Sequence, residues 1–414
     1  MGMYCYQCQE AAKNVACTKN GVCGKHADVA NLQDLLNYQL KGISLWAVAA
    51  RAAGVTDEAT DLFVIESLFS TVTNVNFDAD WFEARITAGQ AVREAIAAKC
   101  AAASGTAPTH DSATFTVATR EEMLAKGETV GVLSEENEDI RSLKELLVYG
   151  LKGMAAYADH AYVLGEKSAE IYAFIEEALA ATTREGITGD ELTALVLKTG
   201  EQAVNTMALL DKANTETYGT QAASEVDTSL VEGPGILVSG HDLKDIAELL
   251  EQTKDTGINI YTHSEMLPAH AYGELNKYDH LKGNYGMAWH NQHTDFDNFK
   301  GAILMTTNCI KKPKESYKDR IFTTGLVGWP GVAHVAGEAG EAKDFSAVIA
   351  KAQELGSITP EAGKKITVGF AKDQVMAVAD KVIEAVKSGA IKRFVVMAGC
   401  DGHQSARNYY TELA

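Results

Sequence analysis

Residues 235–241 read GILVSGH, residues 258–263 read INIYTH, and residues 302–309 read AILMTTNC. Each segment is a short apolar run that leads into a side chain able to bind a metal, and RFVVMAGC at 393–400 repeats the pattern. In an open α/β sheet, ligands bind beyond the carboxyl ends of the strands. The segments therefore predict a parallel sheet on which four donors converge at one edge: His241, Glu265, Cys309 and Cys400.

Each of these donors also has an ordinary interpretation. His241 precedes a predicted helix and could be a polar residue near its N-terminus, and Glu265 could be a loop acid with His263 competing as the donor. Cys309 and Cys400 are stronger candidates, because each follows an apolar strand and has small or polar neighbours. A mixed set of imidazole, carboxylate and thiolate suits iron better than magnesium, and zinc remains open.

Length and composition describe a globular protein of more than one domain. The chain has 414 residues, 46% of them hydrophobic and 22% charged, so two or three domains are expected. A net charge of −19 argues against nucleic acid or an anionic membrane as a partner. No apolar run approaches twenty residues and the N-terminus is not a signal peptide, so we expect a cytoplasmic protein. Its seven cysteines are then thiols or metal ligands.

Four of the cysteines form a cluster near the N-terminus with the spacing C-x2-C-x8-C-x5-C: Cys5, Cys8, Cys17 and Cys23. Four thiolates on a short irregular loop can bind zinc or an iron–sulfur cluster. Zinc ribbons usually carry two C-x2-C pairs, and the second pair is missing, so the spacing favours iron–sulfur. Cys100 lies in an Ala-rich run without a cysteine neighbour and is expected to be an ordinary helix residue.

Residues 31–220 are predicted to be helical and duplicated. The segment LQDLLNYQLKG at 32–42 aligns with LKELLVYGLKG at 143–153, and the same constant offset relates Phe63 to Phe174 and Gly89 to Gly200. This indicates two copies of a three-helix unit, at about 31–100 and 142–213, joined by a polar linker at 102–118. No titratable groups gather there at a site-like spacing, so the bundles are expected to be a scaffold.

From residue 221 onward, short β-branched runs alternate with amphipathic helices, which is typical of a parallel sheet. The predicted helices are 242–253 and 373–388. One domain, 221–362, is expected to hold strands at 235–239, 258–262, 302–306 and 321–324. A second set of strands at 366–370 and 394–398 starts another α/β domain at 363–414. Two parallel strands leave open edges, so we expect this last domain to be incomplete in the chain.

The predicted fold is therefore multidomain, α plus α/β. A cysteine loop at 1–30 precedes the pair of three-helix bundles at 31–220. Rossmann-like parallel-sheet α/β domains follow, and the last of them is incomplete.

Several motifs closely resemble those of the hybrid cluster protein (prismane) family: YCYQCQEA at 4–11, GHDL at 240–243, YTHSEMLP at 261–268, TTNC at 306–309 and MAGCDG at 397–402. The resemblance covers the whole chain. It implies reduction of hydroxylamine to ammonia and water, in nitrogen metabolism, with electrons from an electron-donor protein. The same family also allows nitric oxide reduction or protein S-nitrosylation.

The resemblance further implies two cofactors. Cys5, Cys8, Cys17 and Cys23 would hold a 4Fe-4S cluster. His241, Glu265, Cys309 and Cys400 would hold a hybrid iron–sulfur–oxygen (4Fe-2O-2S) cluster, with Cys400 at the persulfide position. His263 is then no ligand, although it stays a candidate proton donor, as do Tyr285 and His290.

The chain departs from the family at its C-terminal end. Two further cysteines, a second glutamate and a nearby lysine would lie beyond residue 414. We therefore expect the chain to hold the N-terminal cluster and to assemble the hybrid cluster poorly when alone. The alternatives from other classes are a fragment that acts only as a 4Fe-4S electron carrier and a half-protein that needs a partner chain to complete the site.

Overall fold

The computed structural model describes residues 2–397, 401–402 and 406–414. Its contacts divide the chain into two compact units, each described by itself. The helical unit comprises residues 1–213 with the short segments 326–331 and 339–341. The sheet unit comprises residues 214–325, 332–338 and 342–414.

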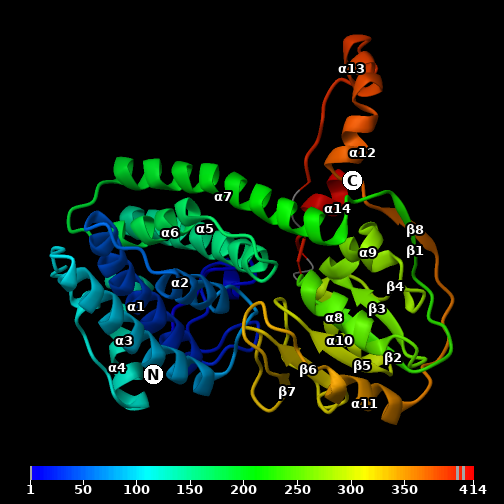
Figure 1. Cartoon of the computed structure of the whole chain (residues 1–414), viewed down its shortest axis with the longest axis horizontal. Coiled ribbons are helices and arrows are strands. Elements are labelled where there is room, and N and C mark those ends of the chain that lie inside the picture. Colours follow the sequence, from blue (N-terminus) through cyan, green and yellow to red (C-terminus); the bar gives the residue numbers. More distant parts are fainter. Residues whose placement is uncertain (1, 398–400, 403–405) are drawn as a thin grey trace. The chain divides into compact units, whose positions relative to one another are not determined.

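The helical unit is built on two sets of three helices, which are labelled in Figure 1. The first set is α1 (Ala27–Ala52), α2 (Glu58–Ser70) and α3 (Ala79–Ala102), and the second is α5 (Glu138–Tyr162), α6 (Ala169–Ala181) and α7 (Gly189–Tyr218). Helix α5 starts at the same offset from α1 as α6 does from α2, and this offset is the one that separates the aligned sequence segments. The offset of α7 from α3 differs by a single position. The helix starts therefore follow the repeat that the sequence shows.

The predicted linker at 102–118 holds the short 3-10 turn η2 (Asp111–Ala113). The helix α4 (Arg120–Val130) and the 3-10 turn η3 (Val132–Ser134) follow it before the second set begins. Thr119 and Glu122 start α4 with a reciprocal capping box, which satisfies backbone N–H groups that the first helical turn leaves unpaired. A Cβ on Gly42 of α1 would lie 1.9 Å from the carbonyl oxygen of Ser112, so this close approach needs glycine.

Leucines of the repeated segment form much of the helical core. On α1, Leu32, Leu35, Leu36 and Leu40 are fully buried. Their counterparts Leu147 and Leu151 on α5 are fully buried as well, whereas Leu146 is 53% exposed. The copies thus share a periodicity but not an identical environment. Cys100 is buried in α3, in the ordinary helical role that its sequence context predicts.

One buried ion cluster joins the two helix sets. Arg51 of α1 contacts Asp61 of α2 at 2.5 Å and Glu176 of α6 at 2.9 Å. Burial and the charge of the nearby Asp61 together raise the pKa of Glu176 to about 8, against the lowering effect of Arg51. Two carboxylates therefore share one guanidinium in a place where charge is costly.

The sheet unit contains a six-stranded parallel sheet in the order β4-β3-β2-β5-β6-β7. Its strands are β2 (Gly235–Ser239), β3 (Asn259–His263), β4 (Leu281–Asn284), β5 (Ala302–Met305), β6 (Ile321–Thr324) and β7 (Ala333–Val335). The predicted strands are found within one residue at each end, whereas β4 and β7 were not predicted. Every residue of β2, β3, β5 and β6 is buried, as in parallel sheets covered on both faces.

Helices and short turns complete this unit. They are α8 (Leu243–Thr253), η4 (Ser264–Ala271), α9 (Gly273–Asn276), η5 (Trp289–Asn291), α10 (Gln292–Asn298) and α11 (Ser346–Leu355). Asp242 caps α8, since its side chain accepts the backbone N–H groups of Lys244 and Asp245. The predicted helix at 242–253 is thus present, with its first residue as the cap.

The prediction that residues 366–370 begin a second parallel set is wrong. Strand β8 (Lys365–Val368) pairs antiparallel with β1 (Ser224–Asp227), so that Val226 lies opposite Ile366. The chain returns to a nearby unpaired strand, which satisfies the backbone groups of both. The short apolar run was correctly identified as a strand, but such a run does not specify its partner.

The segment after β8 also differs from expectation. The predicted helix at 373–388 is broken at Val378 into α12 (Lys372–Ala377) and α13 (Ala379–Lys387), and α14 (Tyr409–Leu413) follows later. Residues 394–397 form no strand, and Val396 is 87% exposed. Without a neighbouring strand, an apolar run has no ladder of hydrogen bonds to join. In the described part of the chain, no helix is long and apolar enough to cross a membrane.

Candidate metal centres

The N-terminal cysteines lie on one irregular loop of the helical unit. Cys5 and Cys17 face each other in an antiparallel bridge, with backbone hydrogen bonds of 3.1 and 2.8 Å in the two directions. Cys17 is buried beside Met3 and Ala30 of α1. The bridge folds the loop back on itself, so cysteines twelve positions apart in the sequence become neighbours.

The other two cysteines complete the group. Burial raises the pKa of Cys8 and of Cys23, and the charges of Cys5 and its neighbours act on both thiols. Lys25 opposes this effect at Cys23 by favouring its thiolate. Four thiols within electrostatic reach of one another, on a loop without regular structure, fit an iron–sulfur cluster in donor type and number. Over the residues that the structure describes, no three His, Cys, Asp or Glu side chains lie close enough to hold a metal ion as they stand.

The second candidate centre lies where the strand order of the sheet reverses. The chain runs outward from β2 through β3 to β4, then returns to the other side of β2 with β5. Ser239 is in register with Met305, so the loops after β2 and β5 leave the sheet side by side. Ligand sites of open parallel sheets form at this topological switch point. His241 follows β2 and Cys309 follows β5, so the reversal brings these two loops together.

Direct hydrogen bonds join the two loops. Thr307 Oγ1 accepts the backbone N–H of His241 at 2.8 Å and lies 2.9 Å from Nδ1 of its imidazole ring. Gly240 makes the contact possible: it has φ +117°, and a Cβ there would lie 2.4 Å from Thr306 Oγ1. Thr307 therefore fixes the orientation of the His241 ring, as hydrogen-bond partners behind metal-binding histidines do.

The other two predicted donors that the structure describes, Cys309 and Glu265, are not fully buried. Cys309 is half-buried, and the side chain of Gln292 donates to its carbonyl oxygen at 3.0 Å. Glu265 is exposed at the start of η4, just beyond β3, where Ser264 donates to its carboxylate. The three strand ends thus lie at one sheet edge, but the Glu265 side chain is turned to solvent. Cys400 lies outside the described residues.

His263 is fully buried with both ring nitrogens engaged. Its Nδ1 lies 2.9 Å from Ser239 Oγ, and its Nε2 lies 3.2 Å from a carboxylate oxygen of Asp295. These contacts use the two positions through which an imidazole binds a metal. They support Glu265 over His263 as the donor that follows β3.

A family model for the Prismane/CO dehydrogenase family matches residues 3–414. The chain belongs to this family. The resemblance that the sequence motifs predict is thereby confirmed, and so is the succession of a helical N-terminal region and a parallel-sheet α/β region.

Several curated relatives of this Prismane/CO dehydrogenase family member are named hydroxylamine reductase. The protein from Desulfitobacterium hafniense (strain DSM 10664 / DCB-2) is 55% identical over 417 residues, which cover 100% of this chain and 76% of the relative. The protein from Kosmotoga olearia is 55% identical over 423 residues, with the same coverage. The chain thus spans about three-quarters of the length of these relatives.

Solved structures offer only a weak likeness. A carbon monoxide dehydrogenase from Thermococcus sp. AM4 is 15% identical, with a TM-score of 0.45, and the match covers 99% of this chain and 65% of that one. Such values say nothing about the chemistry of this family member.

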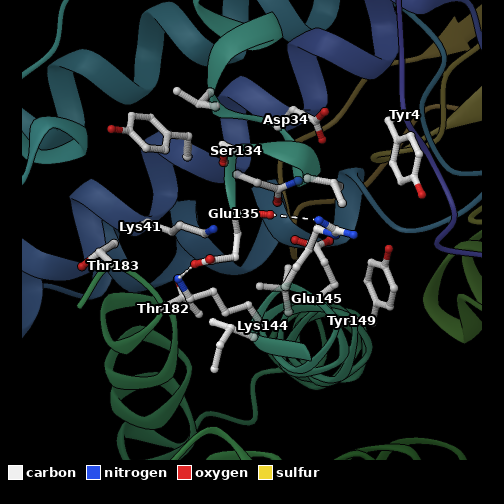
Figure 2. A pocket seen from close by; sticks show the side chains of 18 of the residues that line it. Tyr4, Asp34, Lys41, Ser134, Glu135, Lys144, Glu145, Tyr149, Thr182 and Thr183 are labelled. Carbon is white, nitrogen blue, oxygen red and sulfur yellow. Dashed lines mark hydrogen bonds and ion pairs between the residues drawn. The ribbon is translucent and has the colours of Figure 1, made fainter. Parts of the chain in front are cut away.

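The structure also contains a cleft that sequence reasoning missed. It has a volume of about 600 Å³ in the helical unit and is lined by the N-terminal loop, α1, α5 and the loops at 130–137 and 182–187 (Figure 2). Two of its acids, Asp34 and Glu145, are equivalent in the internal repeat, and so are two of its lysines, Lys41 and Lys152. The expectation that the bundles gather no titratable groups is therefore wrong. Charged positions retained in both copies were the signal that could have revealed the cleft.

Proposed function

We propose that the chain is a hydroxylamine reductase that converts hydroxylamine to ammonia and water with two electrons and two protons. The observation that carries this proposal is the 55% identity, over the whole chain, to proteins of that name. Iron–sulfur groups would supply electrons and a Lewis-acidic iron that binds the N–O compound. An electron-donor protein would be the source of the electrons.

The N-terminal loop is the proposed place of electron entry. Cys5, Cys8, Cys17 and Cys23 would hold the 4Fe-4S cluster with their thiolates. Support comes from the Cys5–Cys17 bridge and from the mutual electrostatic effects of the four thiols. Burial of Cys17 against α1 would anchor one side of this cluster to a rigid element.

The sheet edge is the proposed site of reduction. His241, Glu265, Cys309 and Cys400 would contribute to the 4Fe-2O-2S hybrid cluster, with Cys400 at the persulfide position. Support comes from the switch-point geometry and from Thr307, which orients the His241 ring. His263 and Asp295 form a buried pair just beneath this edge, where a proton could be held close to the reaction.

Analysis of the chain purified without oxygen tests the function. Iron and acid-labile sulfide are measured together with the EPR spectrum, and hydroxylamine turnover is followed with a reduced dye. Iron sufficient for both centres, with ammonia formed from hydroxylamine, would support the function and overturn the expectation that the hybrid cluster assembles poorly in the chain alone. Iron sufficient for one cluster, without turnover, would instead favour the 4Fe-4S electron carrier. That alternative rests on all four N-terminal cysteines lying within one unit.

The contact behind His241 gives a second test. Thr307→Val removes the hydroxyl that holds both the backbone and the ring of His241. Loss of such a partner typically lowers metal affinity by about 10–100-fold. We therefore expect weaker iron binding at the sheet edge and an unchanged EPR signal from the N-terminal cluster.

Thr253→Val is the matched control for this variant. Thr253 is a buried threonine whose hydroxyl bonds to the Leu249 carbonyl at the far end of α8. It should leave iron binding as in the unmodified chain. Equal iron affinity in both variants would show that Thr307 has no part in the centre.

A further inference from the structure

The cleft of the helical unit brings titratable side chains next to the N-terminal cysteine loop. Cys5 and Tyr4 belong to its lining, as do Asp34 of α1 and Glu145 and Lys152 of α5. Figure 2 shows Asp34, Glu145 and Tyr149 around the same space, with Tyr4 at its side. The cleft therefore connects the proposed cluster to groups that can gain or lose a proton.

The four repeat-related charges in this cleft are not locked in ion pairs. Within the described part of the chain, Asp34, Lys41, Glu145 and Lys152 form no salt bridge with one another, and the Lys152 ammonium lies 3.5 Å from the carbonyl oxygen of Thr71. Lys144, by contrast, pairs with Glu135 at 2.8 Å. The charge of the first four groups is thus set by burial and by longer-range interactions.

Burial brings the pKa values of two of these groups close to neutral pH. It raises the pKa of Asp34 to about 7, and the charge of Glu145 adds to the effect while Lys152, Lys25 and Lys41 oppose it. Burial also lowers the pKa of Lys152 to about 8, although Glu145 acts in the opposite direction. Both side chains therefore change protonation when a modest charge appears nearby.

Such a charge would come from the cysteine loop. The charge of Cys5 acts on both Lys152 and Tyr149. Aromatic contacts join the cysteine loop to α5. The ring centroids of Tyr4 and Tyr6 are 5.6 Å apart, and those of Tyr6 and Tyr149 are 6.2 Å apart. The Lys152 ammonium lies 5.8 Å from the centre of the Tyr149 ring. These contacts place aromatic rings between the cysteine loop and α5, and charge is screened less beside such groups than in bulk water.

We propose that Asp34 and Lys152 take up a proton from solvent when the N-terminal cluster accepts an electron. The inference rests on the proposed 4Fe-4S cluster. One electron from the donor protein reduces the cluster, and one solvent proton binds the Asp34 carboxylate or the Lys152 amine. The net charge of the cleft then stays the same. The hydroxylamine reaction consumes two protons with its two electrons, so this site would bring a proton into the protein with each electron.

A redox titration followed by EPR tests the proposal. The midpoint potential of the N-terminal cluster is measured from pH 6 to 9 in the full chain. Proton uptake linked to one electron lowers the potential by up to about 59 mV for each tenfold fall in proton concentration. We expect such a slope in the unmodified chain, a shallower one in Asp34→Asn and in Lys152→Met, and none in the double variant.

Two further variants separate titration from structural damage. Lys152→Arg keeps a positive charge that does not titrate, so it should flatten the slope while holding the low-pH potential. Lys198→Met removes an exposed lysine of α7 outside the cleft and should keep the full slope. A pH-independent potential in the unmodified chain, or a full slope in the double variant, overturns the proposal. Absence of a cluster signal would overturn the cluster itself and this inference with it.

Discussion

Replacing Cys17 with serine is expected to abolish the N-terminal iron–sulfur cluster. Cys17 is the buried member of the group and is held opposite Cys5 by two backbone hydrogen bonds. A serine hydroxyl is a poor ligand for iron, and it would place an oxygen in a spot formed by Met3 and Ala30. The variant should lose the iron and sulfide of one cluster and its EPR signal, and hydroxylamine turnover should fall below detection.

Cys100→Ala is the control for this experiment. Cys100 is also a buried cysteine of the helical unit, but it packs in α3 against Ala47, Ala50 and Ile96. Its removal leaves a small cavity, with an expected cost of about 1 kcal/mol, and should change neither iron content nor turnover. An N-terminal cluster that survives in Cys17→Ser, or disappears in Cys100→Ala, would contradict the assignment.

Arg51→Met is expected to destabilise the helical unit by about 3–5 kcal/mol at pH 8, the usual cost of removing one partner from a buried ion cluster. Without the guanidinium, Asp61 and Glu176 face each other with no cation between them. The Oε1 atom of Glu176 is already a buried oxygen without a hydrogen-bond partner in the described structure. Urea unfolding of the purified chain would measure the loss.

The same variant should show a distinctive pH dependence. The pKa of Glu176 is about 8 in the folded chain, above its unfolded value of 4.5, so the folded state keeps this proton longer. Its contribution to stability is full below pH 4.5 and is lost as the pH rises toward 8. Loss of Arg51 removes the cation that lowers this pKa, so the destabilisation should be clearly smaller at pH 5 than at pH 8.

Arg184→Met provides the matched comparison. Arg184 pairs with Glu191 at 2.6 Å, but both side chains are about half exposed, and surface ion pairs contribute little. This variant should unfold like the unmodified chain at both pH values. A destabilisation by Arg51→Met that is equal at pH 5 and pH 8 would mean that burial of charge is not its cause.

Local patterns in the sequence predicted much of the architecture. Strands β2, β3, β5 and β6 were found because each is a continuous apolar run, as expected for parallel strands that are buried on both faces. Strand β4, with the sequence LKGN, was missed because Lys282 and Gly283 break that pattern. The pairing of β8 with β1 could not be predicted, since it depends on which unpaired strand lies nearby and not on the strand's own residues.

Some residues of the candidate sites could be predicted from local sequence, and others could not. The N-terminal cysteines are recognisable from their short spacing, and the strand-end donors from their position after apolar runs. Thr307 did not stand out, because its importance depends on the reach of one loop to His241 across two adjacent strands. The cleft was missed for a related reason: Asp34 and Glu145 lie on different helices, and only the packing of the two repeat copies brings them to one space.

The reversal of strand order at β2 affects the order in which the two proposed centres would acquire iron. The N-terminal cysteines lie within residues 5–23, so a newly made chain can wrap them around metal before its long-range contacts exist. His241 and Cys309 are 68 positions apart and approach only when β5 pairs with β2. Iron binding at the proposed sheet-edge centre would therefore have to follow slow, non-local folding of the sheet.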